Sequence, residues 1–175
     1  MPTTWGPPSL PGLRLEDALV AALDSAGASV TTGNPVVDYE AADGRIEAVY
    51  VEQNGQRTPY HAGQFVLATG GLVGGGVDSD RAHVYEPVFG CHVAHPDDRY
   101  EWSEAAAFGE HAFARFGVTV DGDLRPLDAR GEAEFANLRA AGSVLGGYDF
   151  AAEKSGSGVS LATGFVAGTN AAEVA

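Results

Sequence analysis

The stretch that most constrains the fold lies at the C-terminal end of the chain. Residues 137–143, Asn-Leu-Arg-Ala-Ala-Gly-Ser, form a largely apolar run that stops at a glycine, which is typical of a buried strand. The segment that follows opens with Ser-Gly-Ser-Gly at 155–158 and has the length and composition of a helix over roughly Ser157 to Val174. Gly164, Gly168 and Ala172 recur at every fourth residue. One face of this helix is therefore smooth enough to press against a sheet.

A strand, a turn and a helix in this order would direct unpaired backbone N–H groups and the positive helix end at one point. Such a point suits an anion or an electron-rich ring edge, but a structural turn without a ligand is the alternative. The motif of a dinucleotide turn, G-x-G-x-x-G, fails because Leu161 occupies its third glycine position. Ser157 lacks the flanking glycines of a hydrolase nucleophile, since Ser155 and Val159 stand there.

The first part of the chain predicts a helix followed by a small antiparallel sheet. Apolar residues at helical spacing indicate a helix from Leu15 to Gly27, preceded by a proline- and glycine-rich arm over 1–14. Strand-like runs follow near 35–42, 45–53 and 57–62, separated by Asp43-Gly44 and Asn54-Gly55, which favour hairpin turns. The continuous apolar run 65–71 then predicts a strand buried on both faces. These elements place the chain in the α/β class.

The middle of the chain, residues 78–117, holds most of the aromatic and histidine residues. We predict that it forms a cap or substrate-domain insertion, with one short helix around Glu110 to Phe116. It would separate a first region, 15–77, from a C-terminal strand-turn-helix region, 118–175. The latter is predicted to begin with a small hairpin that turns at Asp121-Gly122.

The charge balance limits the possible partners. With 24 acidic and 10 basic residues, the net charge is −14, which repels phosphate backbones and argues against nucleic acid as a partner. The acidic residues are scattered through every segment, as is typical of a protein from a high-salt cytosol. A single cysteine excludes an internal disulfide and fits a reducing, cytoplasmic compartment. No apolar run approaches the ~20 residues of a membrane span.

A few side chains in the middle segment could carry chemistry. Cys91, His92 and His95 have spacings that could reach one metal ion, but Pro96 follows directly and no second ligand cluster balances them, so we expect no metal site. A cysteine nucleophile paired with a histidine is equally weakly supported. Arg99 could clamp a phosphate or carboxylate with two hydrogen bonds. The alternative for Arg99 is a surface ion pair with one of the neighbouring acids, namely Asp97, Asp98 or Glu101.

Taken together, several segments resemble a known family. These are FVLATGGLVGGGV at 65–77, LRP at 124–126, NLRAAGSVLGGYD at 137–149 and SGSGVSLATGFVAG at 155–168. They resemble the flavin-binding half of flavoproteins with two dinucleotide-binding domains and, among these, the B subunits of anaerobic glycerol-3-phosphate dehydrogenases. Residues 7–19 are similar to the middle of such B subunits, so the chain resembles their C-terminal part. The resemblance implies a partial Rossmann-like FAD/NAD(P)-binding fold with a three-stranded antiparallel meander and a C-terminal helix.

The resemblance also implies a flavin, FMN or FAD, and a set of contacts to it. In the family, the G-x-G-x-x-G turn that holds the pyrophosphate lies upstream of anything similar to residue 1, so this chain alone is expected to hold flavin weakly or not at all. Ser143 stands where the family pattern usually has the aspartate that contacts the ribityl chain. The implied contacts are Thr69, Gly70 and Gly71 near the nucleotide, Gly142 and Ser143 at the ribityl chain, and the N–H groups of Gly156, Ser157, Gly158 and Val159 at the ring edge.

The reaction that the resemblance implies is oxidation of sn-glycerol 3-phosphate to dihydroxyacetone phosphate. Electrons would pass through flavin and an iron–sulfur, membrane-associated subunit to quinone, in a complex with an FAD-containing A subunit. Arg99 would then clamp the substrate phosphate, and His92 or His95 would accept the proton. The alternative is an assembly module that docks the catalytic subunit without binding flavin. The isolated chain is expected to be inactive and, because of unpaired strand edges, to self-associate.

Overall fold

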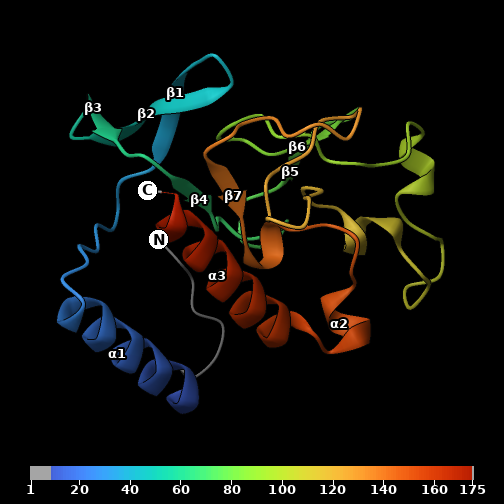
Figure 1. The fold of residues 1–175 in the computed structure, drawn as a ribbon. Coiled ribbons are helices and arrows are strands. Elements are labelled where there is room, and N and C mark those ends of the chain that lie inside the picture. The colour runs from blue at the N-terminus through green and yellow to red at the C-terminus, as the bar shows by residue number, and fades with distance from the viewer. Residues whose placement is uncertain (1–8, 175) are drawn as a thin grey trace. The chain divides into compact units, whose positions relative to one another are not determined.

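The computed structural model describes residues 9–174, which form two compact units divided after Asn34 (Figure 1). The first unit contains helix α1, Leu10–Ser25. The side chain of Ser9 caps it by accepting the N–H of Gly12 at 3.3 Å, and Pro11 sits in the first turn, where its missing N–H costs nothing. The helix therefore begins five residues earlier than the predicted Leu15. This corrects the predicted arm over 10–14, and residues 1–8 of that arm lie outside the described residues.

The second unit opens with the predicted meander, which the structure confirms. Strands β1 (Val36–Ala42), β2 (Arg45–Gln53) and β3 (Gln56–His61) pair antiparallel in that order. Asp43 and Asn54 both have φ of 50°, and the glycine after each is also at positive φ. Tight hairpin turns require positive φ at both central positions, and Asp-Gly and Asn-Gly supply it at low cost.

A parallel pair of short strands lies behind the C-terminal helix (Figure 1). Strand β4 (Phe65–Leu67) pairs with β7 (Leu138–Ala140), and α3 (Gly156–Glu173) packs against both through its buried Ala167. Helix α3 was predicted to within one residue. The predicted strand over 65–71 is shorter, and it is not buried on both faces, because Val66 is 45% exposed. In addition, β4 has a strand on one edge only in the described chain.

The segments between these elements are mostly irregular. They contain the hairpin β5 (Asp78–Ser79) and β6 (Val84–Tyr85), the 3-10 turns η1 (Arg99–Glu101), η2 (Ala112–Arg115) and η3 (Gly142–Val144), and the one-turn helix α2 (Phe150–Glu153). The predicted helix over 110–116 is only the 3-10 turn η2. The hairpin predicted at Asp121-Gly122 is reduced to a single bridge between Val120 and Pro126, and α2 was not predicted.

The core joins the meander to these segments. Strand β1 packs on the core through an aromatic cluster. The centroid of the Tyr39 ring lies 5.3 Å from that of Phe89 and 5.7 Å from that of Phe135. Asn137, which is buried, exchanges two 2.8 Å hydrogen bonds with the backbone of Ile46 and donates a third to the carbonyl of Gly63. The buried core consists mainly of Ile46, Leu67, Val77, Val84, Phe89, Cys91, Val93, Phe116, Val118, Leu138, Ala140, Val144 and Leu145.

Candidate functional site

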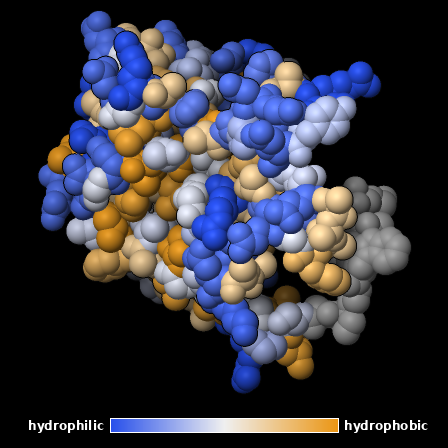
Figure 2. Space-filling view, turned by 90° about the vertical axis from the view of Figure 1, so that its right-hand side faces the viewer, coloured by the Kyte–Doolittle hydropathy of each residue, from blue (hydrophilic) through white to orange (hydrophobic). Residues whose placement is uncertain are grey.

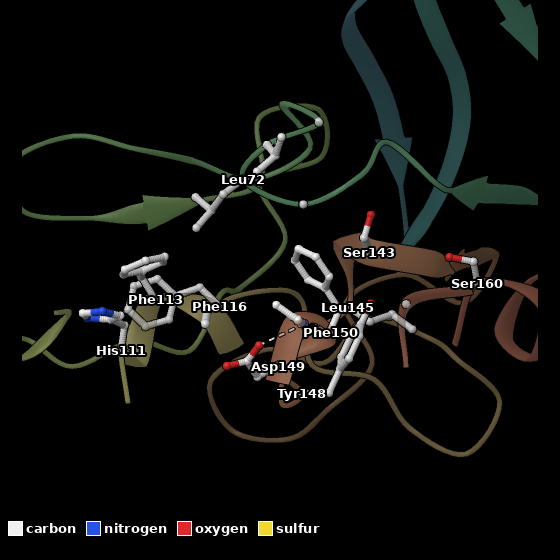
Figure 3. Close-up of a pocket in the computed structure, with 16 residues that line it drawn as sticks. Leu72, His111, Phe113, Phe116, Ser143, Leu145, Tyr148, Asp149, Phe150 and Ser160 are labelled. Atoms are coloured by element: carbon white, nitrogen blue, oxygen red, sulfur yellow. Dashed lines mark hydrogen bonds between the residues drawn. The ribbon is translucent and has the colours of Figure 1, made fainter. Parts of the chain in front are cut away.

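A cavity of about 560 Å³ lies in the second unit, where the loop after β4, the turn η3 and the start of α3 meet. Figure 3 shows Leu72, Phe113 and Phe116 on one side of it and Ser143, Leu145 and Ser160 on the other. Most of this lining is carbon, with few polar groups among it. Cavities of this size and composition suit an aromatic ligand, since apolar walls cover its faces and a few polar groups orient it.

Two glycines shape this side of the cavity, Gly71 by a close approach of backbone and Gly142 by its positive φ. A Cβ added at Gly71 would lie 2.6 Å from the carbonyl oxygen of Ser143, so the loop after β4 can cross η3 only without a side chain at that position. Gly142 adopts a φ of 76° and donates its N–H to Oγ1 of Thr163 on α3 at 2.9 Å. The turn is thereby held against the helix, as a close approach of backbone requires.

The start of α3 leaves donors free beside the cavity. The N–H of Val159 donates to the carbonyl of Ser155 at 2.9 Å and closes the first helical turn. The N–H groups of residues 156–158 therefore have no partner within the helix, and the positive end of the helix dipole lies with them. Gly156 lines the cavity, whereas Ser157 and Gly158 are exposed and do not line it.

The structure thus brings together part of the flavin contacts that the resemblance implied. Gly71, Ser143 and Gly156 line one cavity, although 72 residues or more separate the first from the other two in the sequence. Thr69 and Gly70 instead pack against Gly76, where an added Cβ would lie 2.5 Å from Oγ1 of Thr69. The remaining predicted contacts border the cavity without lining it, namely Gly142, Ser157, Gly158 and Val159.

Two hydroxyl groups at this site are buried without a hydrogen-bond partner, Tyr148 OH and Ser155 Oγ. Tyr148 lines the cavity, and Ser155 directly precedes Gly156. Burial, followed by the charge of Glu153, raises the pKa of Tyr148, so its hydroxyl keeps its proton and remains a donor. An unpaired buried hydroxyl costs free energy until a ligand or water satisfies it. The apolar walls, the glycine approach and these hydroxyls together fit a flavin.

The two histidines singled out from the sequence do not line this cavity. His95 is held by its surroundings: its Nδ1 lies 2.9 Å from the carbonyl of Pro96, its Nε2 accepts the N–H of Val84 at 3.3 Å, and its ring packs on Trp102. This network assigns the proton to Nδ1. His92 is exposed, and its backbone N–H donates to Glu134.

The histidine that does line the cavity is His111, at the start of η2. Its Nδ1 accepts the N–H of Glu104 at 3.1 Å, and its ring stacks on Phe113 at 5.2 Å between centroids. Sequence reasoning did not select it. Its only signal was its membership of the aromatic- and histidine-rich segment, which does not distinguish it from the other histidines there.

Cys91 is unsuited to nucleophilic or metal chemistry in this conformation. Its side chain is buried, and burial, followed by the charges of Glu134 and Glu86, raises the pKa of the thiol far above its ordinary value. The thiolate is the reactive and metal-binding form, so this cysteine stays inert near neutral pH. Residues 9–174 contain no group of three or more His, Cys, Asp or Glu side chains that could hold a metal ion.

Arg99 lies in η1, away from the first cavity. Its guanidinium carbon lies 5.0 Å from the centroid of the Tyr100 ring, and Nη2 donates to the Tyr100 hydroxyl at 3.3 Å. The alternative of a surface ion pair is not observed, because Asp98 accepts the N–H of Tyr100 and none of the neighbouring acids pairs with Arg99. Arg99 instead lines a second cavity.

The surface carries exposed apolar side chains near these cavities. Val73 and Phe150, which line the first cavity, are 97% and 52% exposed. The space-filling view shows hydrophobic residues gathered between hydrophilic ones on one face (Figure 2). Within residues 9–174, no helix has the length and apolar character needed to cross a membrane.

Comparison with known proteins identifies relatives of this chain. Residues 1–159 match the family described as FAD binding domain. The chain is 65% identical over 168 residues to the probable B subunit of anaerobic glycerol-3-phosphate dehydrogenase from Halobacterium salinarum. The aligned region covers 96% of this chain and 39% of that protein. It is 39% identical to the B subunit of anaerobic glycerol-3-phosphate dehydrogenase from Yersinia pseudotuberculosis, and the aligned region covers 89% of this chain and 36% of that protein. The B subunit from Vibrio cholerae is 36% identical to the chain, and the aligned region covers 91% of this chain and 36% of that protein.

These relatives confirm the resemblance drawn from the sequence motifs. The chain spans about two fifths of the length of the relatives that it matches. No solved structure matches it.

Proposed function

Because the chain belongs to the FAD binding domain family, we propose that its cavity beside α3 is part of the flavin site of an oxidoreductase. The observation that carries this proposal is the apolar cavity bounded by Gly71, Ser143 and Gly156, with the unpaired hydroxyl of Tyr148 on one of its lining residues. The family description favours FAD over FMN. The parallel pair β4–β7 under α3 supports a partial Rossmann-like fold, in which ligands bind at the carboxyl ends of parallel strands.

The residues of this chain would hold and orient the flavin. Gly71 and Gly156 would let the ring approach the backbone, and the free N–H of Gly156 at the start of α3 would favour the negative charge that reduction places on the ring. The Tyr148 hydroxyl would donate to a polar atom of the flavin, and Ser143 would contact the ribityl chain in place of the usual aspartate. When bound, the flavin supplies hydride and electron transfer, which no protein side chain provides.

For the whole protein, we propose oxidation of sn-glycerol 3-phosphate to dihydroxyacetone phosphate with transfer of electrons to quinone. The names of the relatives support this substrate, and the word subunit in those names supports a complex with other polypeptides. The partners proposed are an FAD-containing A subunit, and an iron–sulfur subunit that is membrane-associated. His111 lines the cavity and His92 and His95 do not, but Nδ1 of His111 accepts the N–H of Glu104 and its Nε2 lies 3.3 Å from the carbonyl of Ala107. Neither ring nitrogen of His111 is therefore free to accept a proton, and we assign the proton acceptor to none of these histidines.

The test is the visible spectrum of the purified chain in concentrated potassium chloride, titrated with FAD and with FMN. We expect weak, saturable binding of FAD, seen as a change in its visible spectrum during the titration. Ser160→Leu would fill the cavity and weaken binding by about tenfold or more, since the ring and the new side chain cannot share the space. Ala162→Leu is the matched control, because it adds a larger side chain on an exposed position of α3 that does not line the cavity.

No spectral change at any FAD concentration would instead favour the assembly module, which docks a catalytic partner and needs no cofactor. That alternative has support in the exposed residues Leu161 and Phe165 of α3, which are 75% and 76% exposed. Self-association of the isolated chain remains a prediction, supported by the unpaired outer edge of β4 within the described residues. Light scattering at several concentrations would contradict it by showing a monomer throughout.

A further inference from the structure

We propose that a second cavity binds the phosphate group of a small phosphate monoester through Arg81 and Arg99. This cavity, of about 570 Å³, lies between the β5–β6 hairpin and η1. The proposal rests on the proposed function for the nature of the substrate, and on the geometry below for the site itself. The residues that line it are Leu72, Ser79, Asp80, Arg81, Arg99, Tyr100, Trp102, Ser103 and Phe113.

The two arginines stand apart from most others in the chain. Four arginines are ion-paired within 4.0 Å of a carboxylate, and two more donate to neutral oxygens of Gly63 and Gln64; these six are Arg57, Arg115, Arg125, Arg130, Arg45 and Arg139. In the described part of the chain, neither Arg81 nor Arg99 has a carboxylate partner. In a protein with 24 acidic residues, two guanidinium groups line one cavity without a carboxylate partner, and Arg99 donates only to the hydroxyl of Tyr100, so the pair points to an external anion.

The one acid in the cavity lining is occupied by its own turn. Oδ1 of Asp80 accepts the N–H groups of Ala82 and His83 at 2.6 Å and 2.7 Å and lies 3.5 Å from Nδ1 of His83. These hydrogen bonds lower the pKa of Asp80, so it stays ionised in the cavity lining, and the two arginines leave a net positive charge of one beside it. Two guanidinium groups and the hydroxyls of Ser79 and Ser103 remain as donors. This donor set matches a phosphate dianion, which accepts several hydrogen bonds and two positive charges.

The two cavities adjoin. Leu72 and Phe113 line both of them, one side chain coming from the loop after β4 and the other from η2. A phosphate held by the arginines would therefore leave its carbon skeleton free to extend past these side chains toward the proposed flavin ring. This arrangement separates recognition of the charged group from the site of oxidation, so binding energy from the phosphate could position the reacting carbon.

The intrinsic fluorescence of Trp102 reports on this cavity, because its side chain lines it. The chain has two tryptophans, so Trp5→Phe leaves Trp102 as the single emitter. In this background we would titrate sn-glycerol 3-phosphate and, separately, inorganic phosphate, at constant potassium chloride and without flavin. Saturable changes with both probes would indicate recognition of the anion alone, and tighter binding of glycerol 3-phosphate would show that the skeleton is recognised as well. Both results support the site.

Arg81→Gln and Arg99→Gln should each weaken binding about tenfold, and the double variant should abolish it, because each removes one charge-assisted contact. Arg57→Gln is the matched control. It removes the same charge from an arginine that pairs with Asp38 on the meander, and it should bind as the parent does. Circular dichroism would verify that all variants fold alike.

Three results would overturn the proposal: no saturable change in the parent, parental affinity in the double variant, or equal weakening in Arg57→Gln. Because no flavin is present, failure here is distinct from failure of flavin binding. A chain that binds flavin but no phosphate would refute this site alone, and the reverse result would refute the flavin site alone.

Discussion

Buried polar groups are treated in opposite ways in two regions of the second unit. At the junction of the meander and the core, Asn137 and Glu86 are 1% exposed and each makes three hydrogen bonds to backbone. Near the first cavity, the hydroxyls of Tyr148, which lines it, and of Ser155, which precedes the lining residue Gly156, are buried and make none. The chain therefore satisfies buried polar atoms at Asn137 and Glu86, which hold segments together, although Nε of Arg139 in β7 is also buried without a partner.

The difference indicates what each region is for. A satisfied buried group contributes to stability, and its loss leaves its partners unpaired, which costs about 1–3 kcal/mol for each orphaned group. An unsatisfied group lowers the stability of the free protein and gains a partner only when something enters the cavity. Folding would thus depend on the first region, and ligand binding on the second.

Asn137→Ala should produce the largest effect. It would leave the N–H and carbonyl of Ile46 unpaired in the core, so the free energy of unfolding should fall by roughly 2–5 kcal/mol. Denaturant unfolding in concentrated potassium chloride would measure it. Asn34→Ala, which removes only a contact to the carbonyl of Thr32, is the control and should change little. If Asn137→Ala lowers the free energy of unfolding no more than this control does, the satisfied buried groups do not stabilise the fold as we infer.

How far the sequence predicted this structure depends on how local each feature is. The meander was predicted because Asp43-Gly44 and Asn54-Gly55 encode their turns within two residues. The start of α1 was missed, although Ser9 and Pro11 form a local signal, because the prolines and glycines around them are typical of an irregular arm. The pairing of β4 with β7 joins segments some 70 residues apart, and no local pattern encodes that register.

The residues that line the first cavity also divide into those that the sequence indicated and those that only the tertiary packing brings there. Gly71, Ser143 and Gly156 were predicted because motif resemblance carries information about distant positions. His111 and Tyr148 were missed, because what brings their side chains to the cavity is the packing of irregular segments around η2 and α2. Neither segment has hydrophobic periodicity from which an orientation could be predicted.

Glu86→Gln should have the second largest effect on stability. The carboxylate accepts the N–H groups of Val88 and Phe89 at 2.8 Å and 2.7 Å, and an amide must turn one of its own donors toward a donor. We expect the free energy of unfolding to fall by about 2 kcal/mol. The matched control is Glu47→Gln on the exposed face of β2. Equal unfolding midpoints for the two variants would show that burial of Glu86 does not matter.

A smaller effect is expected where polar groups are satisfied at the surface. Backbone N–H groups, that of Glu132 foremost, hold the pKa of Asp128 below its usual range. The pKa of Asp121 is also lowered: burial alone would raise it, but the hydrogen bonds from Arg125 and Asp123 outweigh burial. A folded pKa below the unfolded value stabilises above about pH 4, and this stability is lost as the pH falls through the folded pKa.

Asp128→Asn should therefore destabilise the chain at pH 7 by less than Glu86→Gln does, and the gap to the parent should close on acidification below about pH 4. Thermal unfolding across this pH range would measure the gap. Asp43→Asn is the control, since asparagine suits a hairpin turn and should leave the profile parallel to that of the parent. A gap in Asp128→Asn that stays constant below pH 4 would mean that the carboxylate contributes no pH-linked stability.

Tyr148→Phe should have the smallest effect on stability and is the sharpest test of the comparison. It removes a buried hydroxyl that has no partner, so the free chain should be unchanged or stabilised by up to about 1 kcal/mol. With FAD present the order should reverse, because the variant loses a donor to the flavin and its affinity should fall by roughly fivefold. Unfolding measured with and without FAD would show both signs in one experiment. A variant that is destabilised without flavin would place Tyr148 with Asn137 and Glu86, as a residue that holds the fold rather than the ligand.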